Sequence, residues 1–208
     1  LGGGTDPVPA LTDTFTAFDI FKDGENTEAN LLLQGGHSTE VAKYLIELAN
    51  TRKDAIVFCS PTPLTLVKDQ TVGVAYDNII DWRVNTLAAD TSYAVIDSGW
   101  KYQYDKYNDT YRWVPLNADI AGLCARTDST ANPWFSPAGY NRGIIRNCVK
   151  LAFNPSKTYR DGLVTYQINP VVTQAGSGTL LLGDKTALTK PSAFDRLSIR
   201  RLFVAMEK

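Results

Sequence analysis

Apolar residues recur along the chain at helical spacing in some segments and as short continuous runs in others. Spacings of three and four residues predict an amphipathic helix that begins after Ser38 or Thr39 and runs through STEVAKYLIELANTR. Its apolar positions are Val41, Tyr44, Leu45 and Leu48. Apolar runs at residues 30–34 (NLLLQ) and 55–59 (AIVFC) flank this helix and predict buried strands. Strand, helix and strand joined by short loops form a βαβ unit, in which the two strands are parallel.

The same patterns predict the remaining elements. Further helices are expected at residues 11–21, 72–87, 115–125, 157–168 and 194–208. Further strands are expected at residues 92–97 and, as two short strands, within 171–184. Residues 1–9 and 127–143 are predicted loops, and residues 144–153 fit either a strand or a helix. The expected fold is α/β, a mixed β-sheet flanked by helices, in one domain over residues 1–208.

Aromatic and polar residues alternate over residues 101–114 (KYQYDKYNDTYRWV), which predicts a β-hairpin turning at Asn108-Asp109. Three interpretations of the aromatic side chains remain open. They can pack on one another across the strands, stack against bases or sugars, or form a protein–protein surface.

Composition narrows the classes of function. The chain has 208 residues with 21 Lys and Arg against 22 Asp and Glu, so no basic field favours a nucleic-acid partner. No apolar stretch is long enough to span a membrane. Three scattered cysteines favour neither a disulfide framework nor a metal site, and Cys59 within AIVFC is expected to be a buried thiol. Because the chain opens LGGGTDPVP without Met, we expect it to be a piece of a longer protein.

Candidate chemistry is sparse. The single histidine, His37, could act as a base at the end of a strand, or simply occupy the turn before a helix. The QGGHST segment is glycine-rich and precedes a helix, but it lacks the spacing and the lysine of a phosphate-binding loop. No nucleophile motif such as GxSxG occurs. We therefore expect no enzyme activity, catalytic residue, metal or cofactor, and keep a nucleotide- or sugar-binding α/β domain as the alternative function.

Three arginines, Arg196, Arg200 and Arg201, lie in the last predicted helix. Arg196 and Arg200 are four residues apart, which would place them on one face of that helix. Such a patch can be a solvated face, or can meet an acidic face of a neighbour in a repeating assembly.

Several motifs together resemble one protein family. They are AIVFCSP (55–61), YDNIIDWR (76–83), residues 93–128 from YAVIDSGW to CARTD, WFSPAGYNRG (134–143), INPV (168–171) and LLLGDKTALTKPSAFDRLSIRRL (180–202). In combination they resemble the tail sheath proteins of contractile-tailed bacteriophages of the T-even (myovirus) type. The resemblance extends over nearly the whole chain and is weakest before Gly35.

The resemblance implies a structural subunit without catalytic residues or cofactors. Such subunits form a helical sleeve around the inner tail tube, and the sleeve contracts when the baseplate triggers it, driving the tube through the host envelope for genome delivery. The implied partners are neighbouring sheath subunits, the tube protein, the baseplate and the tail terminator, with no direct contact to nucleic acid or membrane. The implied location is the virion, after synthesis in the host cytoplasm.

The family's subunits are longer than this chain. They carry outer domains upstream and a C-terminal domain that meshes with neighbouring subunits, so we expect the isolated fragment to be monomeric. On this basis we expect subunit contacts at two places. One is the predicted hairpin, through Tyr104, Tyr107 and Trp113. The other is the basic patch of Arg196, Arg200 and Arg201.

Overall fold

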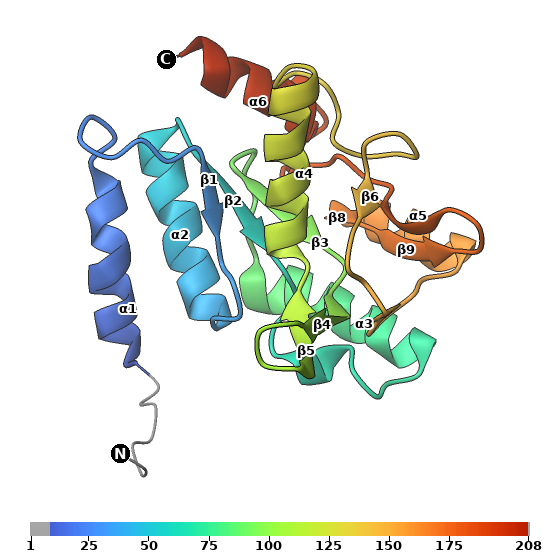
Figure 1. Cartoon of the computed structure of the whole chain (residues 1–208). Helices are drawn as coiled ribbons and strands as arrows, with labels where there is room; N and C mark the ends of the chain where they lie inside the picture. Colours follow the sequence, from blue (N-terminus) through green and yellow to red (C-terminus); the bar gives the residue numbers. More distant parts are fainter. Residues whose placement is uncertain (1–8, 208) are drawn as a thin grey trace.

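The computed structural model describes residues 9–207, so the predicted loop at residues 1–9 lies almost entirely outside the described residues. A four-stranded parallel sheet forms the centre of the molecule (Figure 1). Its strands, in spatial order, are β1 (Leu31–Leu33), β2 (Ile56–Cys59), β3 (Ala94–Asp97) and β8 (Ile168–Asn169). The predicted parallel βαβ unit is confirmed, with Leu32 opposite Val57 in the register of β1 and β2.

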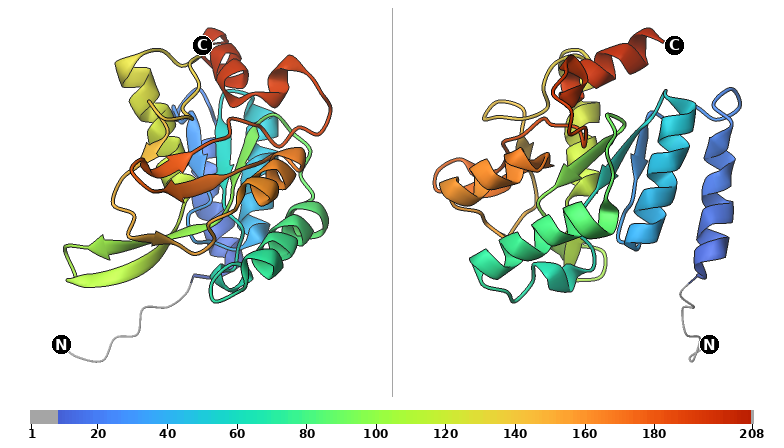
Figure 2. Two further views of the ribbon diagram at one scale, coloured as in Figure 1. Left: turned by 90° about the vertical axis from the view of Figure 1, so that its right-hand side faces the viewer. Right: turned by 180° about the vertical axis from the view of Figure 1, so that it is seen from behind.

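Helices cover both faces of this sheet. The helical segments are α1 (Leu11–Phe18), η1 (Asp19–Lys22), α2 (Thr39–Arg52), η2 (Leu64–Leu66), α3 (Val72–Asp81), the π-helical η3 (Trp82–Leu87), α4 (Asn117–Thr130), α5 (Lys157–Thr165), η4 (Ala193–Asp195) and α6 (Leu197–Met206). Helices α2, α3 and α5 lie on one side of the sheet, seen from behind in Figure 2, and α4 crosses the other side.

Alternation along the strands divides the core into two layers. In β2, Val57 and Cys59 pack toward α2 and α3, whereas Ile56 and Phe58 pack toward α4 and α6. Because successive side chains of a strand point to opposite faces, a strand covered on both sides must be apolar throughout. The run AIVFC meets this requirement, and the predicted burial of Cys59 is confirmed.

Two antiparallel sheets complete the fold. Strands β6 (Ile144–Ile145), β10 (Gly178–Leu181) and β9 (Val171–Gln174) form one, and β5 (Thr110–Pro115), β4 (Trp100–Asp105) and β7 (Lys150–Leu151) form the other. The predicted class, α/β with parallel and antiparallel strands flanked by helices, is confirmed. The structure adds that parallel and antiparallel strands belong to separate sheets.

Four predicted boundaries are wrong. Pro115 ends β5 instead of starting a helix, and α4 starts at Asn117, whose backbone N–H donates to the Ser60 hydroxyl (3.0 Å). The same helix runs to Thr130, five residues beyond the prediction. The helix predicted to reach residue 168 ends at Thr165, because residue 167 adopts a left-handed backbone (φ 59°) and the next two residues pair with β3. The last helix starts at residue 197, three residues late.

Candidate assembly surface

The hairpin of β4 and β5 carries a ladder of aromatic rings on one face. Tyr102 lies opposite Trp113 in the register, and Tyr104 lies opposite Tyr111. Ring centroids are 4.9 Å apart for Tyr102 and Trp113, and 5.2 Å apart for Tyr104 and Tyr111. The Lys150 ammonium from β7 lies over the rings of Tyr102 and Trp113, 5.3 and 5.6 Å from their centroids. The rings thus pack on one another, which is the first of the three interpretations of the sequence.

The turn of the hairpin projects from the body of the molecule (Figure 2, left). Tyr107 at its tip is 87% exposed, and its backbone N–H donates to the Asp105 carboxylate (3.0 Å). The base of the hairpin is held by Lys101, whose ammonium donates to Asp119 (2.8 Å) inside the molecule. The hairpin is thus anchored at its base and presents an exposed aromatic side chain at its tip.

The three arginines of the expected basic patch have different surroundings. Arg196 lies in extended backbone before α6, with its side chain 60% exposed and 3.6 Å from Asp184. It is outside the helix, so the predicted shared face of Arg196 and Arg200 is wrong.

The other two arginines are buried within the chain. The Arg200 guanidinium lies between the rings of Tyr93 and Phe194, 4.3 Å from each centroid. Arg201 pairs with Asp128 on α4 and is 5% exposed. Both therefore hold α6 against the sheet and α4, in place of forming an exposed patch.

Polar side chains close the carboxyl end of the parallel sheet, where α/β proteins commonly bind ligands. The Gln34 side-chain oxygen accepts from the Ser60 backbone N–H (3.1 Å), and its amide donates to Thr62 (3.1 Å). The Ser60 hydroxyl donates to the buried carboxylate of Asp97 (2.7 Å). The Trp100 indole N–H donates to the carbonyl of Pro61 (2.7 Å). These groups bond to one another, and in the described part of the chain the Asn117 side-chain oxygen is the one buried acceptor of this cluster without a partner.

The order of the strands also argues against a nucleotide site in the parallel sheet. The strands run β1, β2, β3, β8 across the sheet without reversal, so the sheet lacks the topological switch point at which such folds bind nucleotides. His37 is exposed on the turn before α2, with its ring edge-on to Phe18 at 6.3 Å, in agreement with a turn residue. The alternative of a nucleotide- or sugar-binding domain is not supported.

Burial changes the acid–base properties of this region. Desolvation raises the pKa of Asp97 to about 8, although the hydrogen bonds from Ser60 and the Gly99 backbone act in the opposite direction. Burial also raises the pKa of the Cys124 thiol to about 12, which makes it a poor nucleophile. The sequence alone predicts neither pKa shift. Whether the side chains of Asp97 and Cys124 are buried depends on segments that lie far away along the chain.

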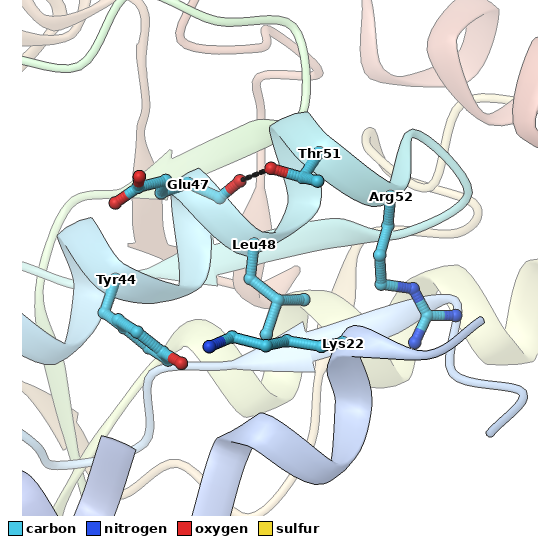
Figure 3. Close-up of a pocket in the computed structure, with 6 residues that line it drawn as sticks. All are labelled: Lys22, Tyr44, Glu47, Leu48, Thr51 and Arg52. Carbon is cyan, nitrogen blue, oxygen red and sulfur yellow. Dashed lines mark hydrogen bonds between the residues drawn. The ribbon is translucent and has the colours of Figure 1, made fainter. Parts of the chain in front are cut away.

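A pocket of about 250 Å³ lies between η1 and α2 (Figure 3). Lys22, Tyr44, Glu47, Leu48, Thr51 and Arg52 line it. The Lys22 ammonium forms an ion pair with Asp19 (2.9 Å), and Asp19 also accepts from the Tyr44 hydroxyl. The Tyr44 hydroxyl thus joins α2 to η1 through Asp19, while the Lys22–Asp19 ion pair lies within η1.

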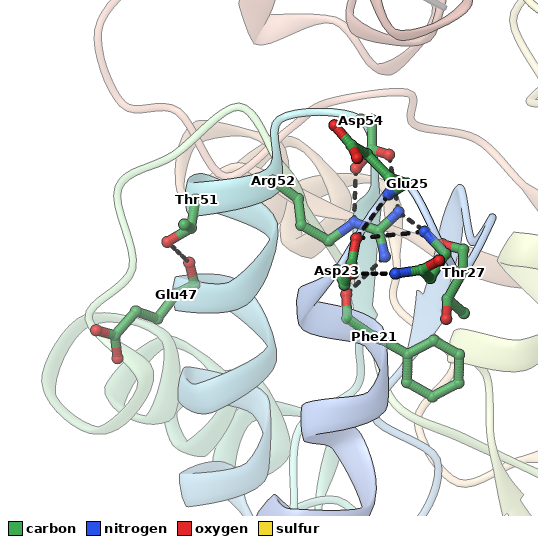
Figure 4. A network of polar contacts seen from close by, with 9 residues as sticks. Phe21, Asp23, Glu25, Thr27, Glu47, Thr51, Arg52 and Asp54 are labelled. Carbon is green, nitrogen blue, oxygen red and sulfur yellow. Dashed lines mark hydrogen bonds and ion pairs between the residues drawn. The ribbon is translucent and has the colours of Figure 1, made fainter.

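Arg52, at the end of this pocket, forms hydrogen bonds to three other segments of the chain (Figure 4). Its guanidinium binds Asp54 through two nitrogens (2.7 Å each) and donates to the carbonyls of Phe21 (2.6 Å) and Thr27 (3.1 Å). These bonds fasten the segment after α1 to the end of α2. The role is structural, and nothing in the local sequence distinguishes this arginine from an exposed one.

Residues 9–207 lack two kinds of site. No cluster of three or more His, Cys, Asp and Glu in this part of the chain is arranged to hold a metal ion. No helix within it combines the length and apolarity needed to cross a bilayer.

Residues 9–187 match the family described as phage tail sheath protein central domain. The chain is 45% identical to the tail sheath protein of Vibrio phage KVP40, over 100% of this chain and 34% of that protein. It is also 45% identical to the tail sheath protein of Enterobacteria phage T4, over 98% of this chain and 33% of that protein. The chain therefore spans about a third of the length of these relatives.

Two solved structures have a fold similar to that of this chain. The contracted helical sheath of the anti-feeding prophage superposes with a TM-score of 0.69 at 15% identity, covering 97% of this chain and 51% of that one. The sheath tail protein of Desulfitobacterium hafniense superposes with a TM-score of 0.62 at 13% identity, covering 99% and 43%.

Proposed function

The chain belongs to the phage tail sheath protein family, and we propose on this premise that it is the central part of a contractile tail sheath subunit. In this role, copies of the full-length subunit polymerise around the inner tail tube and contract to drive the tube through the host envelope. The observation that carries the proposal is the match of residues 9–187 to the central domain of tail sheath proteins.

The proposed role also implies partners and a location. We propose neighbouring sheath subunits, the tube protein, the baseplate and the tail terminator as partners, and the virion as the location, with no nucleic acid or membrane bound directly. Residues 1–208 would form one domain of the longer subunit, since the two core layers lie on opposite faces of one sheet. The role is mechanical, without catalysis.

The proposed contact residues follow from exposure. Tyr104 and Tyr107 are exposed on the hairpin, Trp113 packs on Tyr102 of the adjacent strand, and Arg196 is exposed before α6. For Arg200 and Arg201 a contact role stays a prediction. Their burial means that reversing their charge would perturb the fold before it perturbed any contact.

Negative-stain electron microscopy of the full-length parent protein, expressed alone, tests the proposal. We expect hollow tubes or stacked rings, because a head-to-tail interface that does not close on itself produces an open helix. Dispersed globular particles at high concentration and low salt would overturn it.

A further inference from the structure

A groove runs along the outer side of α3 and η3, next to the end of α5. It consists of two adjoining hollows of about 390 and 230 Å³, which share Val84 and Tyr166. Both shared residues are exposed, Val84 to 48% and Tyr166 to 39%, and they form an apolar middle. Exposed apolar residues lining a concave surface favour an aromatic anchor from a partner.

The two ends of the groove differ in charge. At one end lie the exposed carboxylates of Asp77 and Asp81, and no lysine or arginine among residues 9–207 lies within ion-pair distance of either. At the other end lies Arg83, which is 5% exposed. Its Nη2 donates to the Ala187 carbonyl (2.9 Å), but its buried Nε has no hydrogen-bond partner among residues 9–207. The exposed carboxylate of Asp90 lines this same end. The groove therefore has one acidic end, at Asp77 and Asp81, and one end where a carboxylate lies beside a buried guanidinium.

The hairpin turn at residues 106–109 carries an exposed aromatic ring and a charge opposite to that of the acidic end. The exposed ring of Tyr107 is flanked by Lys106 on one side and Asp109 on the other. The Lys106 ammonium lies 5.0 Å from the centroid of the Tyr107 ring and forms no ion pair with a carboxylate in the described part of the chain. In the left view of Figure 2 the hairpin extends to one side of the molecule, and α3 and α5 lie on the opposite side.

We propose that the turn at residues 106–109 of one subunit docks into this groove of a neighbouring copy. Tyr107 enters between Val84 and Tyr166, and Lys106 faces Asp77 and Asp81. The inference rests on the proposed function and specifies one of the subunit contacts that it requires.

The placement of the two surfaces fits a polymer. The turn and the groove lie on opposite sides of one molecule, so the contact between them is heterologous. Such a contact repeats head to tail without closing into a dimer. A tyrosine anchor supplies most of the affinity in such a contact, and flanking charges set its orientation.

Charge exchange in the full-length protein tests the contact. We expect Lys106→Glu, and separately the pair Asp77→Lys and Asp81→Lys, to lower the sedimentable polymer fraction at least tenfold. Combining the three substitutions should restore it, because the opposite charges face each other again with their signs exchanged. Tyr107→Ala should also lower the fraction, whereas Tyr140→Ala, which removes another exposed tyrosine, should not. Circular dichroism and the melting temperature of each variant confirm that it is folded.

Cysteine cross-linking tests the direction. Under oxidising conditions, a mixture of Tyr107→Cys and Val84→Cys proteins should form a cross-linked dimer that neither variant forms alone, and the unaltered protein provides the background. If the unaltered parent forms no tubes, the proposed function fails. If tubes form but the variants assemble normally and no mixed dimer appears, only the docking is wrong.

Discussion

Asp97 is a carboxylic acid placed inside the centre of the parallel sheet, 1% exposed at the end of β3. It accepts hydrogen bonds from the Ser60 hydroxyl (2.7 Å) and the Gly99 backbone N–H (2.8 Å). Its partners are neutral donors, and no cation lies within ion-pair distance among residues 9–207. Burial without a compensating charge favours the protonated form, and this is why its pKa rises to about 8.

This shift predicts a pH dependence of stability. Between pH 4 and pH 8 the native carboxyl keeps its proton while the unfolded chain releases it, so the free energy of unfolding falls as pH rises through this range. The slope due to this group is at most about 1.4 kcal/mol per pH unit. In urea unfolding of the 208-residue chain at pH 5, 6.5 and 8, Asp97→Asn should remove this component. The exposed control Asp161→Asn should show the same pH dependence as the unaltered chain. If Asp97→Asn also keeps that pH dependence, Asp97 is not its source.

Helix α6 illustrates how an element is positioned by side chains that its own pattern marks as exposed. Arg200 and Arg201 are charged residues of an amphipathic helix, yet both point into the molecule. Their bonds reach Tyr93 before β3 and Asp128 on α4. The long apolar stems of arginine can pack in the interior when aromatic rings and a carboxylate receive the guanidinium. The helix is thereby fastened to two other elements.

Replacing Arg201 should therefore weaken the fold. We expect Arg201→Ala to lower the free energy of unfolding by about 2 kcal/mol, because Asp128 loses its partner and the buried site loses packing. Arg196→Ala, at an exposed position of the same segment, should change it by less than about 0.5 kcal/mol. Urea unfolding measures both, and equal effects would argue that Arg201 does not anchor the helix.

At the scale of the whole molecule, Asn169 joins the parallel sheet to the segment that follows the antiparallel sheet of β6, β10 and β9. Its amide donates to the carbonyls of Ile96 (2.9 Å) and Lys185 (2.8 Å), and its oxygen accepts from the Lys185 backbone N–H (2.7 Å). The side chain is 1% exposed, so water cannot replace these bonds. One amide thus connects β8, β3 and the chain after β10.

Removing this side-chain amide should lower the free energy of unfolding of the whole molecule. We expect Asn169→Ala to cost about 2–4 kcal/mol, since it leaves buried backbone groups without partners. Asn154→Ala is a matched control, because Asn154 makes a similar pair of bonds to Thr173 at an exposed position. Its effect should stay below about 1 kcal/mol in the same thermal or urea unfolding measurement. A similar loss of unfolding free energy in both variants would show that burial does not determine how much the amide contributes.

Local patterns in the sequence determined much of the molecule. Helical spacing predicted α2, continuous apolar runs predicted β1 and β2, and the alternation of aromatic residues predicted the hairpin of β4 and β5. These predictions succeed because each pattern extends over at least one strand or several helical turns. The motifs from residue 55 to residue 202 also indicated the sheath family, to which the chain belongs.

Only the tertiary structure decided the rest. The two-residue strand β8 exists because it pairs with β3, and two residues are too few to carry a periodic signal. The bonds of Arg200 to Tyr93 and of Arg201 to Asp128 join residues 107 and 73 positions apart, which no local pattern encodes. Burial of a charged group depends on what distant segments place around it, and so the same residue types are exposed at Arg196 and interior at Arg201.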